Sequence, residues 1–501
     1  MVAVPKPTPL TDDQCRELRA ALTEHDYSYD SVVEAIGEEA HHALARNSTV
    51  AARRRLSGRD DPIAVLTLLW PLQQRVRRSA LERALPGLVE PLAAAGIISA
   101  TTEQAWAEVD LRPYASDDGA SGWVVSDLSP NLDTLTAPVR PDFVLGVSSA
   151  STTLAQLTLR RPVERALDLG TGCGVQALHL ARHAASVVAT DLNPRALALA
   201  DLTARLNDIT VDLRPGSLYE PVRGERFDLI TTNPPYVMSP PTSDRDRLTY
   251  REGDLPADGL VEQVVRRGPE HLADGGVLQV LANWAHPLDG SWQDRLLGWI
   301  EPTGCDAYVV QRETLDVYEY IELWLNDAGL AGSPDYARRY VEWVDYFEHL
   351  GIGAVGMGWL TLHQAGRATP WVEIEEWPHA IEQPIGPAIA GQLAAVETER
   401  GLSDQELLGH HWTLAADIVE ETFGSPGSAD PQRIVHRQQR GYRRAVEVDT
   451  ALGGILGACD GDLALARILT SVAEILAVDP ARLAAQTVPT FRALVRQGFL
   501  G

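Results

Sequence analysis

The residues best suited to chemistry are four consecutive ones, Asn233-Pro234-Pro235-Tyr236, which follow the apolar run FDLITT. Proline cannot donate to a sheet ladder, so the two prolines end the strand and stiffen the segment after it. The Asn233 side-chain oxygen and the Pro234 carbonyl can each accept a hydrogen bond from one NH₂ group. Tyr236 can lie flat on the planar group that carries it. We therefore expect this segment to orient a planar nitrogen.

A second chemical signal lies about sixty residues upstream, where ALDLGTGCG places Gly170, Gly172 and Gly174 between an apolar run and a helical pattern. Glycines let the backbone approach a ligand that a Cβ would keep away, and a helix start offers unpaired N–H groups. Asp191 ends the next predicted strand, where it can accept both hydroxyls of a ribose. The G-x-G-x-G spacing, with Asp168 two residues upstream, is the pattern used for S-adenosylmethionine.

Together the two motifs predict methyl transfer to nitrogen, an in-line displacement at carbon in which a neutral thioether leaves. Positioning and exclusion of water can supply most of the acceleration. Asn233 is therefore expected to align the acceptor rather than deprotonate it. The alternative is that Asn-Pro-Pro-Tyr is only a strand-ending turn, and the glycine loop upstream makes that the weaker interpretation.

Alternating strands and helices must position these motifs. We predict seven strands, at 163–169, 186–192, 209–215, 226–232, 275–284, 305–313 and near 351–364. Strands alternating with helices predict an α/β fold, a Rossmann-like parallel, doubly wound sheet with crossover helices. An aromatic-rich insertion at about 313–350 precedes the seventh strand. We expect its rings to pack onto the main domain; a lid or recognition surface is the alternative.

A chain of 501 residues is too long for one ordinary core. We predict a helical N-terminal domain with a β-hairpin (1–130), the methyltransferase domain (131–366) and a mainly helical C-terminal domain (367–501). Helices followed by the β-like runs AWAEVDLRP and GWVVSDL suggest a winged-helix-like N-terminal module. The last residues share the apolar rhythm of residues 61–98, which suggests a similar module at the C-terminus.

The net charge of −26 disfavours broad binding to nucleic acid. A local basic patch is the exception to consider, with candidates Arg53, Arg54, Arg55, Arg59, Arg75, Arg77 and Arg78. No run approaches the roughly 18 apolar residues of a membrane helix, and the first residues lack the pattern of a secretion signal. The four widely spaced cysteines fit a reducing compartment, so we expect a cytoplasmic protein without a metal site.

The segments ALDLGTGCG, ATDLNPRAL and FDLITTNPPYV resemble the class I S-adenosylmethionine-dependent methyltransferases. They are most similar to the branch that methylates planar nitrogens, which includes release-factor glutamine N5-, guanine-N2 and adenine-N6 methyltransferases. The similarity covers roughly residues 140–312. It implies that Asn233, Pro234 and Tyr236 hold the acceptor nitrogen. It also implies that S-adenosylmethionine binds to Asp168, Gly170, Thr171, Gly172, Cys173, Gly174, Asp191, Leu192, Ser217, Leu218 and Asn233.

Two segments depart from the family pattern. Ser217 and Leu218 stand where many relatives have Asp or Asn to bond the adenine amino group, so we expect weaker or backbone-mediated recognition of adenine. The segment RPDFVLGVSSASTTLAQL matches the substrate-proximal loop of the family only loosely. The expected acceptor is an amide, amine or guanidinium of a protein or small molecule. The alternatives are an RNA or DNA base and a non-catalytic scaffold that binds S-adenosylmethionine.

Overall fold

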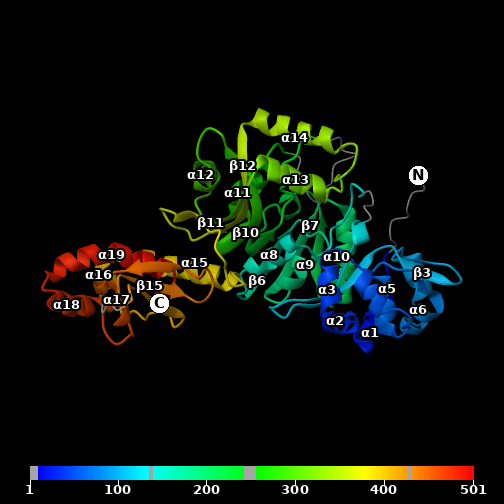
Figure 1. Ribbon diagram of the computed structural model, residues 1–501, viewed down its shortest axis with the longest axis horizontal. Helices are drawn as coiled ribbons and strands as arrows, with labels where there is room; N and C mark the ends of the chain where they lie inside the picture. The colour runs from blue at the N-terminus through cyan, green and yellow to red at the C-terminus, as the bar shows by residue number, and fades with distance from the viewer. Residues whose placement is uncertain (1–8, 135–138, 242–254, 427–430) are drawn as a thin grey trace. The chain divides into compact units, whose positions relative to one another are not determined.

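The computed structural model describes residues 9–134, 139–241, 255–426 and 431–501 (Figure 1). The first eight residues, on which the expected lack of a secretion signal partly rests, lie outside the described residues. The chain forms two compact units. One consists of Met1–Ala155 with Arg161–Trp377, and the other of Gln156–Arg160 with Pro378–Gly501. Each unit is described by itself.

An eight-stranded sheet forms the centre of the first unit, in the order β13-β11-β12-β10-β9-β6-β7-β8. Its strands are β6 (Val163–Leu169), β7 (Ala184–Asp191), β8 (Val211–Pro215), β9 (Phe227–Thr232), β10 (Leu272–Pro287), β11 (Asp306–Asp316), β12 (Ile352–His363) and β13 (Val372–Glu376). The five strands from β10 to β8 are parallel, whereas β12 runs antiparallel to both β10 and β11. All seven predicted strands are present.

The eighth strand, β13, is an addition to the seven predicted strands and lies in the stretch from residue 367 onward that was expected to be mainly helical. β13 pairs in parallel with β11 at the edge of the sheet. Its five residues read VEIEE, so only two apolar side chains alternate with acids. So short an edge strand carries little periodicity.

Helices cover both faces of the sheet (Figure 1). They are α8 (Ser149–Leu157), α9 (Val175–Leu180), α10 (Pro194–Leu206), α11 (Gly259–Arg267) and α12 (Trp292–Ile300). α9 and α10 pack against β6, β7 and β8, whereas α11 and α12 pack against β10. The chain winds outward in opposite directions from β6 and β9. That reversal opens a crevice at the carboxyl ends of these two strands.

The aromatic insertion is a pair of helices, α13 (Val317–Asp327) and α14 (Tyr336–Leu350), between β11 and β12. Asp316 begins α13 with a capping box, and Gly351, at a φ of 65°, ends α14. Tyr320, Trp343 and Phe347 are buried in one cluster with residues that follow Asn-Pro-Pro-Tyr. The expected packing role is therefore seen, while a lid role stays a prediction.

The N-terminal part begins with α1 (Asp12–Glu24), α2 (Tyr29–Ile36), α3 (Glu38–Leu44) and α4 (Val50–Arg55). A module with the element order of a winged helix follows: α5 (Pro62–Leu69), β1 (Val76–Arg77), α6 (Arg78–Ala84), α7 (Val89–Ala94), β2 (Ile98–Ala100) and β3 (Gln104–Ala107). The predicted run AWAEVDLRP divides between β3 and β4 (Asp110–Ala115), and only β4 forms the hairpin with β5 (Ser121–Ser126).

Among its described residues from Pro378 onward, the second unit contains five helices and one sheet: α15 (Gly386–Gly401), α16 (Asp404–Gly409), β14 (Ile418–Phe423), β15 (Arg433–Gln438), β16 (Ala445–Val448), α17 (Thr450–Gly457), α18 (Leu465–Leu476) and α19 (Pro480–Arg496). The antiparallel sheet β14-β15-β16 is an addition to the mainly helical expectation. It precedes the last three helices, and the similarity of these helices to the N-terminal module stays a prediction. Cross-strand ion pairs such as Glu421–Arg437 put charges on these strands, which obscures their apolar alternation.

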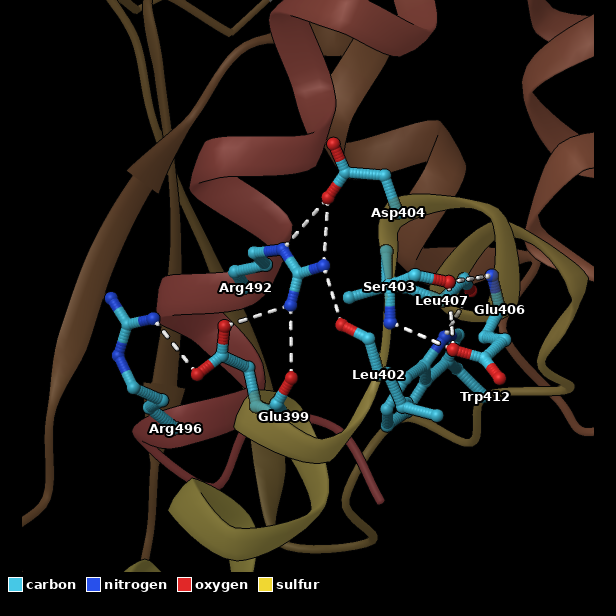
Figure 2. A network of polar contacts seen from close by, with 9 residues as sticks. All are labelled: Glu399, Leu402, Ser403, Asp404, Glu406, Leu407, Trp412, Arg492 and Arg496. Carbon is cyan, nitrogen blue, oxygen red and sulfur yellow. Dashed lines mark hydrogen bonds and ion pairs between the residues drawn. The ribbon is translucent and has the colours of Figure 1, made fainter. Parts of the chain in front are cut away.

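A network of charges around one buried carboxylate joins helices of the second unit (Figure 2). Glu399, near the end of α15, is 5% exposed and accepts from Arg492 Nη1 of α19 at 2.9 Å. Arg492 Nη2 also donates to Asp404 Oδ1 at 2.7 Å, and Arg496 Nη1 lies 3.2 Å from the second Glu399 oxygen. Because buried carboxylates need partners, this network fixes α15 against α19.

Candidate active site

A pocket of about 200 Å³ lies at the carboxyl ends of β6, β7 and β9. Nearly all of the residues predicted from sequence line it: Asp168, Gly170, Thr171, Gly172, Cys173, Asp191, Leu192, Ser217, Leu218, Asn233 and Pro234. Gly174 and Tyr236 are not among its lining residues. The structure therefore brings the two motifs together at the crevice where doubly wound sheets bind ligands.

The glycine loop has a left-handed backbone at all three glycines. The φ angles of Gly170, Gly172 and Gly174 are 79°, 57° and 83°. A Cβ on Gly174 would lie 3.2 Å from the Cα of Ala200, so this glycine lets α9 pack on α10. Cβ atoms on Gly170 and Gly172 would meet no described atom within 4 Å. These two positions leave the pocket open to a ligand.

Two acids of the pocket are largely buried. Asp168 is 1% exposed and accepts a 2.6 Å hydrogen bond from Thr171 Oγ1. Burial raises the pKa of Asp168 to about 7, and the neighbouring charge of Asp191 adds to the rise. Burial also raises the pKa of Asp191, although its oxygens accept from the backbone N–H groups of Gly172 (2.9 Å) and Asn193 (2.8 Å). Two close carboxyl groups favour a ligand that carries positive charge.

The loop after β8 forms the wall next to these acids. Leu218 has a φ of 47°, which is unusual for a residue with a Cβ and strains the backbone. With Ser217, it presents one hydroxyl and one aliphatic side chain to the pocket. The wall therefore carries no acid or amide at these positions, and recognition of adenine by the backbone stays a prediction.

The segment before β6 supplies pocket residues that sequence reasoning missed: Phe143, Val144, Leu145, Gly146, Ser148 and Ser151. Two amides attach it to the domain. Asn193 Nδ2 donates to the Asp142 carbonyl at 2.9 Å, and Gln176 Nε2 donates to the Ser151 carbonyl at 2.7 Å. Both amides also line the pocket. The only signal in the sequence was the loose match of this segment to the substrate-proximal loop of the family.

Asn233 and Pro234 form the edge of the pocket. Thr232 Oγ1 donates to the Leu169 carbonyl at 2.7 Å, which ties the end of β9 to the end of β6. Asn233 Oδ1 is buried, and none of the described residues donates to it. An unpaired buried acceptor costs about 1–3 kcal/mol, so this oxygen is suited to an N–H group of a bound molecule.

Tyr236 lies beside the pocket rather than in its wall. Its ring meets Trp324 of α13 edge-on, at 6.4 Å between centroids, and burial raises its pKa to about 12. The predicted stacking of Tyr236 on the acceptor group therefore stays a prediction. Cys173 is also unsuited to acid–base work, because burial raises the pKa of its thiol to about 11.

The insertion holds the chain immediately after Asn-Pro-Pro-Tyr. The hydroxyl of Tyr320, a fully buried residue of α13, accepts from the Met238 N–H at 3.0 Å and from Asn283 Nδ2 at 2.9 Å. Tyr346 of α14 accepts from the Ala257 N–H at 2.9 Å. Sequence reasoning expected Tyr320 to pack, with a lid or recognition surface as the alternative, since no local pattern reveals which backbone groups a hydroxyl will meet.

The described part of the chain contains no group of three or more His, Cys, Asp or Glu side chains that could hold a metal ion. None of its helices combines the length and apolar character needed to cross a membrane.

Two family models match separate parts of the chain. Residues 146–296 match the family described as "Methyltransferase small domain", a range that includes both motifs and most of the pocket. Residues 24–108 match "Domain of unknown function (DUF7059)", which includes the winged-helix-like module.

Curated relatives are similar over the same central region. The release factor glutamine methyltransferase of Geobacter sulfurreducens is 36% identical over 173 residues, 32% of this chain and 58% of that protein. The ribosomal protein uL3 glutamine methyltransferase of Bradyrhizobium diazoefficiens is 33% identical over 158 residues, 29% of this chain and 50% of that protein.

The release factor glutamine methyltransferase of Bordetella pertussis is 31% identical over 200 residues, 36% of this chain and 70% of that protein. The chain thus spans 58% and 50% of the length of the first two relatives and 70% of the length of this one. The chain belongs to the class I S-adenosylmethionine-dependent methyltransferases, in the branch of the glutamine methyltransferases of release factors and ribosomal protein uL3.

Proposed function

We propose that this protein transfers a methyl group from S-adenosylmethionine to the side-chain amide nitrogen of a glutamine residue in an acceptor protein. The observation that carries the proposal is the buried, unpaired Asn233 Oδ1 at the edge of the pocket. This oxygen lacks a hydrogen-bond donor, and the NH₂ of a glutamine carboxamide can supply one. The relatives are named for glutamine methylation of proteins, which supports the same acceptor class here.

The pocket suits the cofactor. Gly170 and Gly172 leave room for it, and the carboxyl groups of Asp168 and Asp191 favour its positive charge. Ser217 and Leu218 line the same pocket, and we assign them to the adenine. When bound, S-adenosylmethionine supplies an electrophilic methyl group.

The protein's own contribution is orientation of the acceptor. Asn233 Oδ1 accepts one N–H of the amide, and the Pro234 carbonyl accepts the other. Both protons are then directed away from the methyl donor, so the nitrogen faces it. As the carbon–nitrogen bond forms, the sulfur–carbon bond breaks, and the nitrogen afterwards loses one proton to water. Positioning of this kind can supply several kcal/mol of the barrier reduction.

The arginines that a nucleic acid would use are mostly engaged with acids, which favours the protein acceptor. Four of the seven candidates of the predicted basic patch lie in ion pairs: Arg53 with Asp133, Arg59 with Asp61, Arg77 with Asp60, and Arg78 with Glu90. Together with the net charge of −26, this neutralisation disfavours contact with phosphates.

The test uses the purified full chain with methyl-labelled S-adenosylmethionine and an extract of a host that lacks this protein. We expect label in a protein band that protease removes and nucleases leave intact, with mass spectrometry placing it on glutamine. Asn233→Ala should lower the rate at least 100-fold while the Kd of S-adenosylmethionine changes less than threefold. Asn326→Ala, on the exposed side of α13, is the matched control and should keep full activity.

Two results would refute the proposal. One is label that nucleases remove, which would establish a base as the acceptor. The other is an Asn233→Ala enzyme with an unchanged rate, which would show that this oxygen does not orient the acceptor.

A further inference from the structure

A cavity of about 730 Å³ lies within the second unit, and neither motif of the methyltransferase contributes to it. One wall is a face of α15 with small residues at helical spacing: Pro387, Ala388, Gly391 and Ala395. A Cβ on Gly391 would meet no described atom within 4 Å. The other walls include larger side chains: Trp412, Tyr442, Val495 and Leu500.

One buried amide in this cavity lacks a partner. Gln392, on the same face of α15, is 5% exposed, and its Nε2 donates to none of the described residues. Gln438, a second lining amide, is satisfied, because its Nε2 donates to the Gln497 carbonyl at 2.8 Å and its Oε1 accepts from the Arg444 N–H at 3.3 Å. The free donor of Gln392 therefore points to an acceptor that the described residues do not provide.

The cavity is suited to an uncharged guest. Its acidic lining residues are engaged with backbone groups: Glu382 accepts from the Gly441 N–H at 3.1 Å, and Asp417 accepts from the Arg440 N–H at 3.2 Å. Among the described lining residues, no charged side chain is fully buried. Because these two acids and the lining Arg440 stay partly or fully exposed, the buried part of a guest would meet no charged side chain.

Ion pairs between α15 and α19 hold the walls of this cavity in place without a guest. Arg492 and Arg496 of α19 bind Glu399 near the end of α15, so the helix that carries Gln392 is fixed against α19 (Figure 2). A site whose walls are fixed in advance requires little ordering when it is filled.

We propose that this cavity binds a small, uncharged molecule with a mainly apolar body and one carbonyl oxygen, which accepts a hydrogen bond from Gln392 Nε2. Its volume lies in the range of small-molecule sites, about 300–1,000 Å³, and such sites combine apolar walls with a few polar groups that fix orientation. The proposal does not depend on the acceptor of the methyl group.

The test measures binding of three fluorinated probes to the full chain by ¹⁹F line broadening. The probes are 4-fluoroacetophenone, 1-ethyl-4-fluorobenzene, which lacks the carbonyl, and 4-fluorobenzoate, which is charged. We expect the ketone to bind about fivefold to tenfold more tightly than the hydrocarbon, as one hydrogen bond allows, and the benzoate not to bind. Gln392→Leu should bind ketone and hydrocarbon equally, and Ala395→Trp, which fills the cavity, should bind neither.

The thermal midpoint shows whether each variant is folded. Gln392→Leu removes an unpaired buried donor, so its midpoint should equal or exceed that of the wild type. If Ala395→Trp does not fold, Gln392→Leu decides alone. Equal affinity of the wild type for ketone and hydrocarbon, a ketone preference that survives Gln392→Leu, or no binding of either at millimolar concentration overturns the proposal.

Discussion

Replacing Asp168 by Asn tests how the pocket recognises a positively charged cofactor. Burial raises the pKa of Asp168 to about 7, so near pH 6 only about one carboxyl group in eleven is ionised. If the cofactor binds the ionised form, its affinity for the wild type should be about tenfold lower at pH 6 than at pH 8.5. Asp168→Asn is always neutral, so it should lack this contribution.

The assay is titration calorimetry of S-adenosylmethionine with both proteins between pH 5.5 and 8.5. The amino group of the ligand titrates in both experiments, so the ratio of the two Kd values isolates the carboxyl group. We expect that ratio to grow about tenfold between pH 6 and pH 8. A ratio that stays constant with pH would refute the assignment of Asp168 to the cofactor's charge.

The same substitution should affect stability in the opposite direction. Between about pH 4 and pH 7 the unfolded chain releases the Asp168 proton while the folded chain keeps it, so wild-type stability falls as pH rises through this window. The rise in pKa from 3.8 to about 7 sets an upper limit of about 4 kcal/mol. Asp168→Asn should therefore unfold at a higher temperature than the wild type, with a larger difference at pH 8 than at pH 5.

Three further substitutions test features outside the Asp168 site. Tyr320→Phe removes the hydroxyl that holds the chain after Asn-Pro-Pro-Tyr, so kcat should fall about 10- to 100-fold while the Kd for S-adenosylmethionine stays unchanged. Tyr318→Phe, at an exposed site, is the control and should have no effect. Gly172→Ala and Gly224→Ala each place a Cβ on a left-handed residue, so each should lower the free energy of unfolding by about 1 kcal/mol in thermal unfolding. Only Gly172→Ala should also weaken cofactor binding, by at least tenfold in calorimetry. Arg492→Met leaves the buried carboxylate near the end of α15 with one partner and should destabilise the second unit by about 2–3 kcal/mol in denaturant titration.

A specific result would contradict each of these three predictions. A Tyr320→Phe enzyme with full kcat would make that hydroxyl a packing feature only. Equal loss of cofactor affinity in the two glycine variants would trace the effect to stability rather than to ligand approach. An unchanged denaturation midpoint for Arg492→Met would show that the network of Figure 2 contributes no net stability.

Much of the α/β fold could be predicted because glycines and prolines mark where its strands end. Glycines after Leu169 and prolines after Asn233 stop two apolar runs, and parallel strands that end together place those residues at one edge. The pocket residues of both motifs followed from that geometry. The antiparallel direction of β12 was not predicted, because alternating strands and helices indicate parallel strands.

Features that depend on distant contacts could not be predicted. The unpaired state of Asn233 Oδ1 is visible only when every neighbour is placed, and so is the Tyr320 hydroxyl between Met238 and Asn283. β13 owes its strand conformation to pairing with β11 more than to its own sequence. The predicted domain limits at 130 and 366 stay predictions.

The N-terminal helices share a hydrophobic core with the α/β domain. Leu18 and Leu22 of α1 belong to the same buried cluster as Leu202 and Leu206 of α10, and Arg205 of α10 bonds the Leu10 carbonyl. An expression fragment that begins at residue 131 would therefore expose to water the side of α10 that packs against α1. Such a fragment should be recovered as aggregates, even though it keeps every residue of the cofactor pocket.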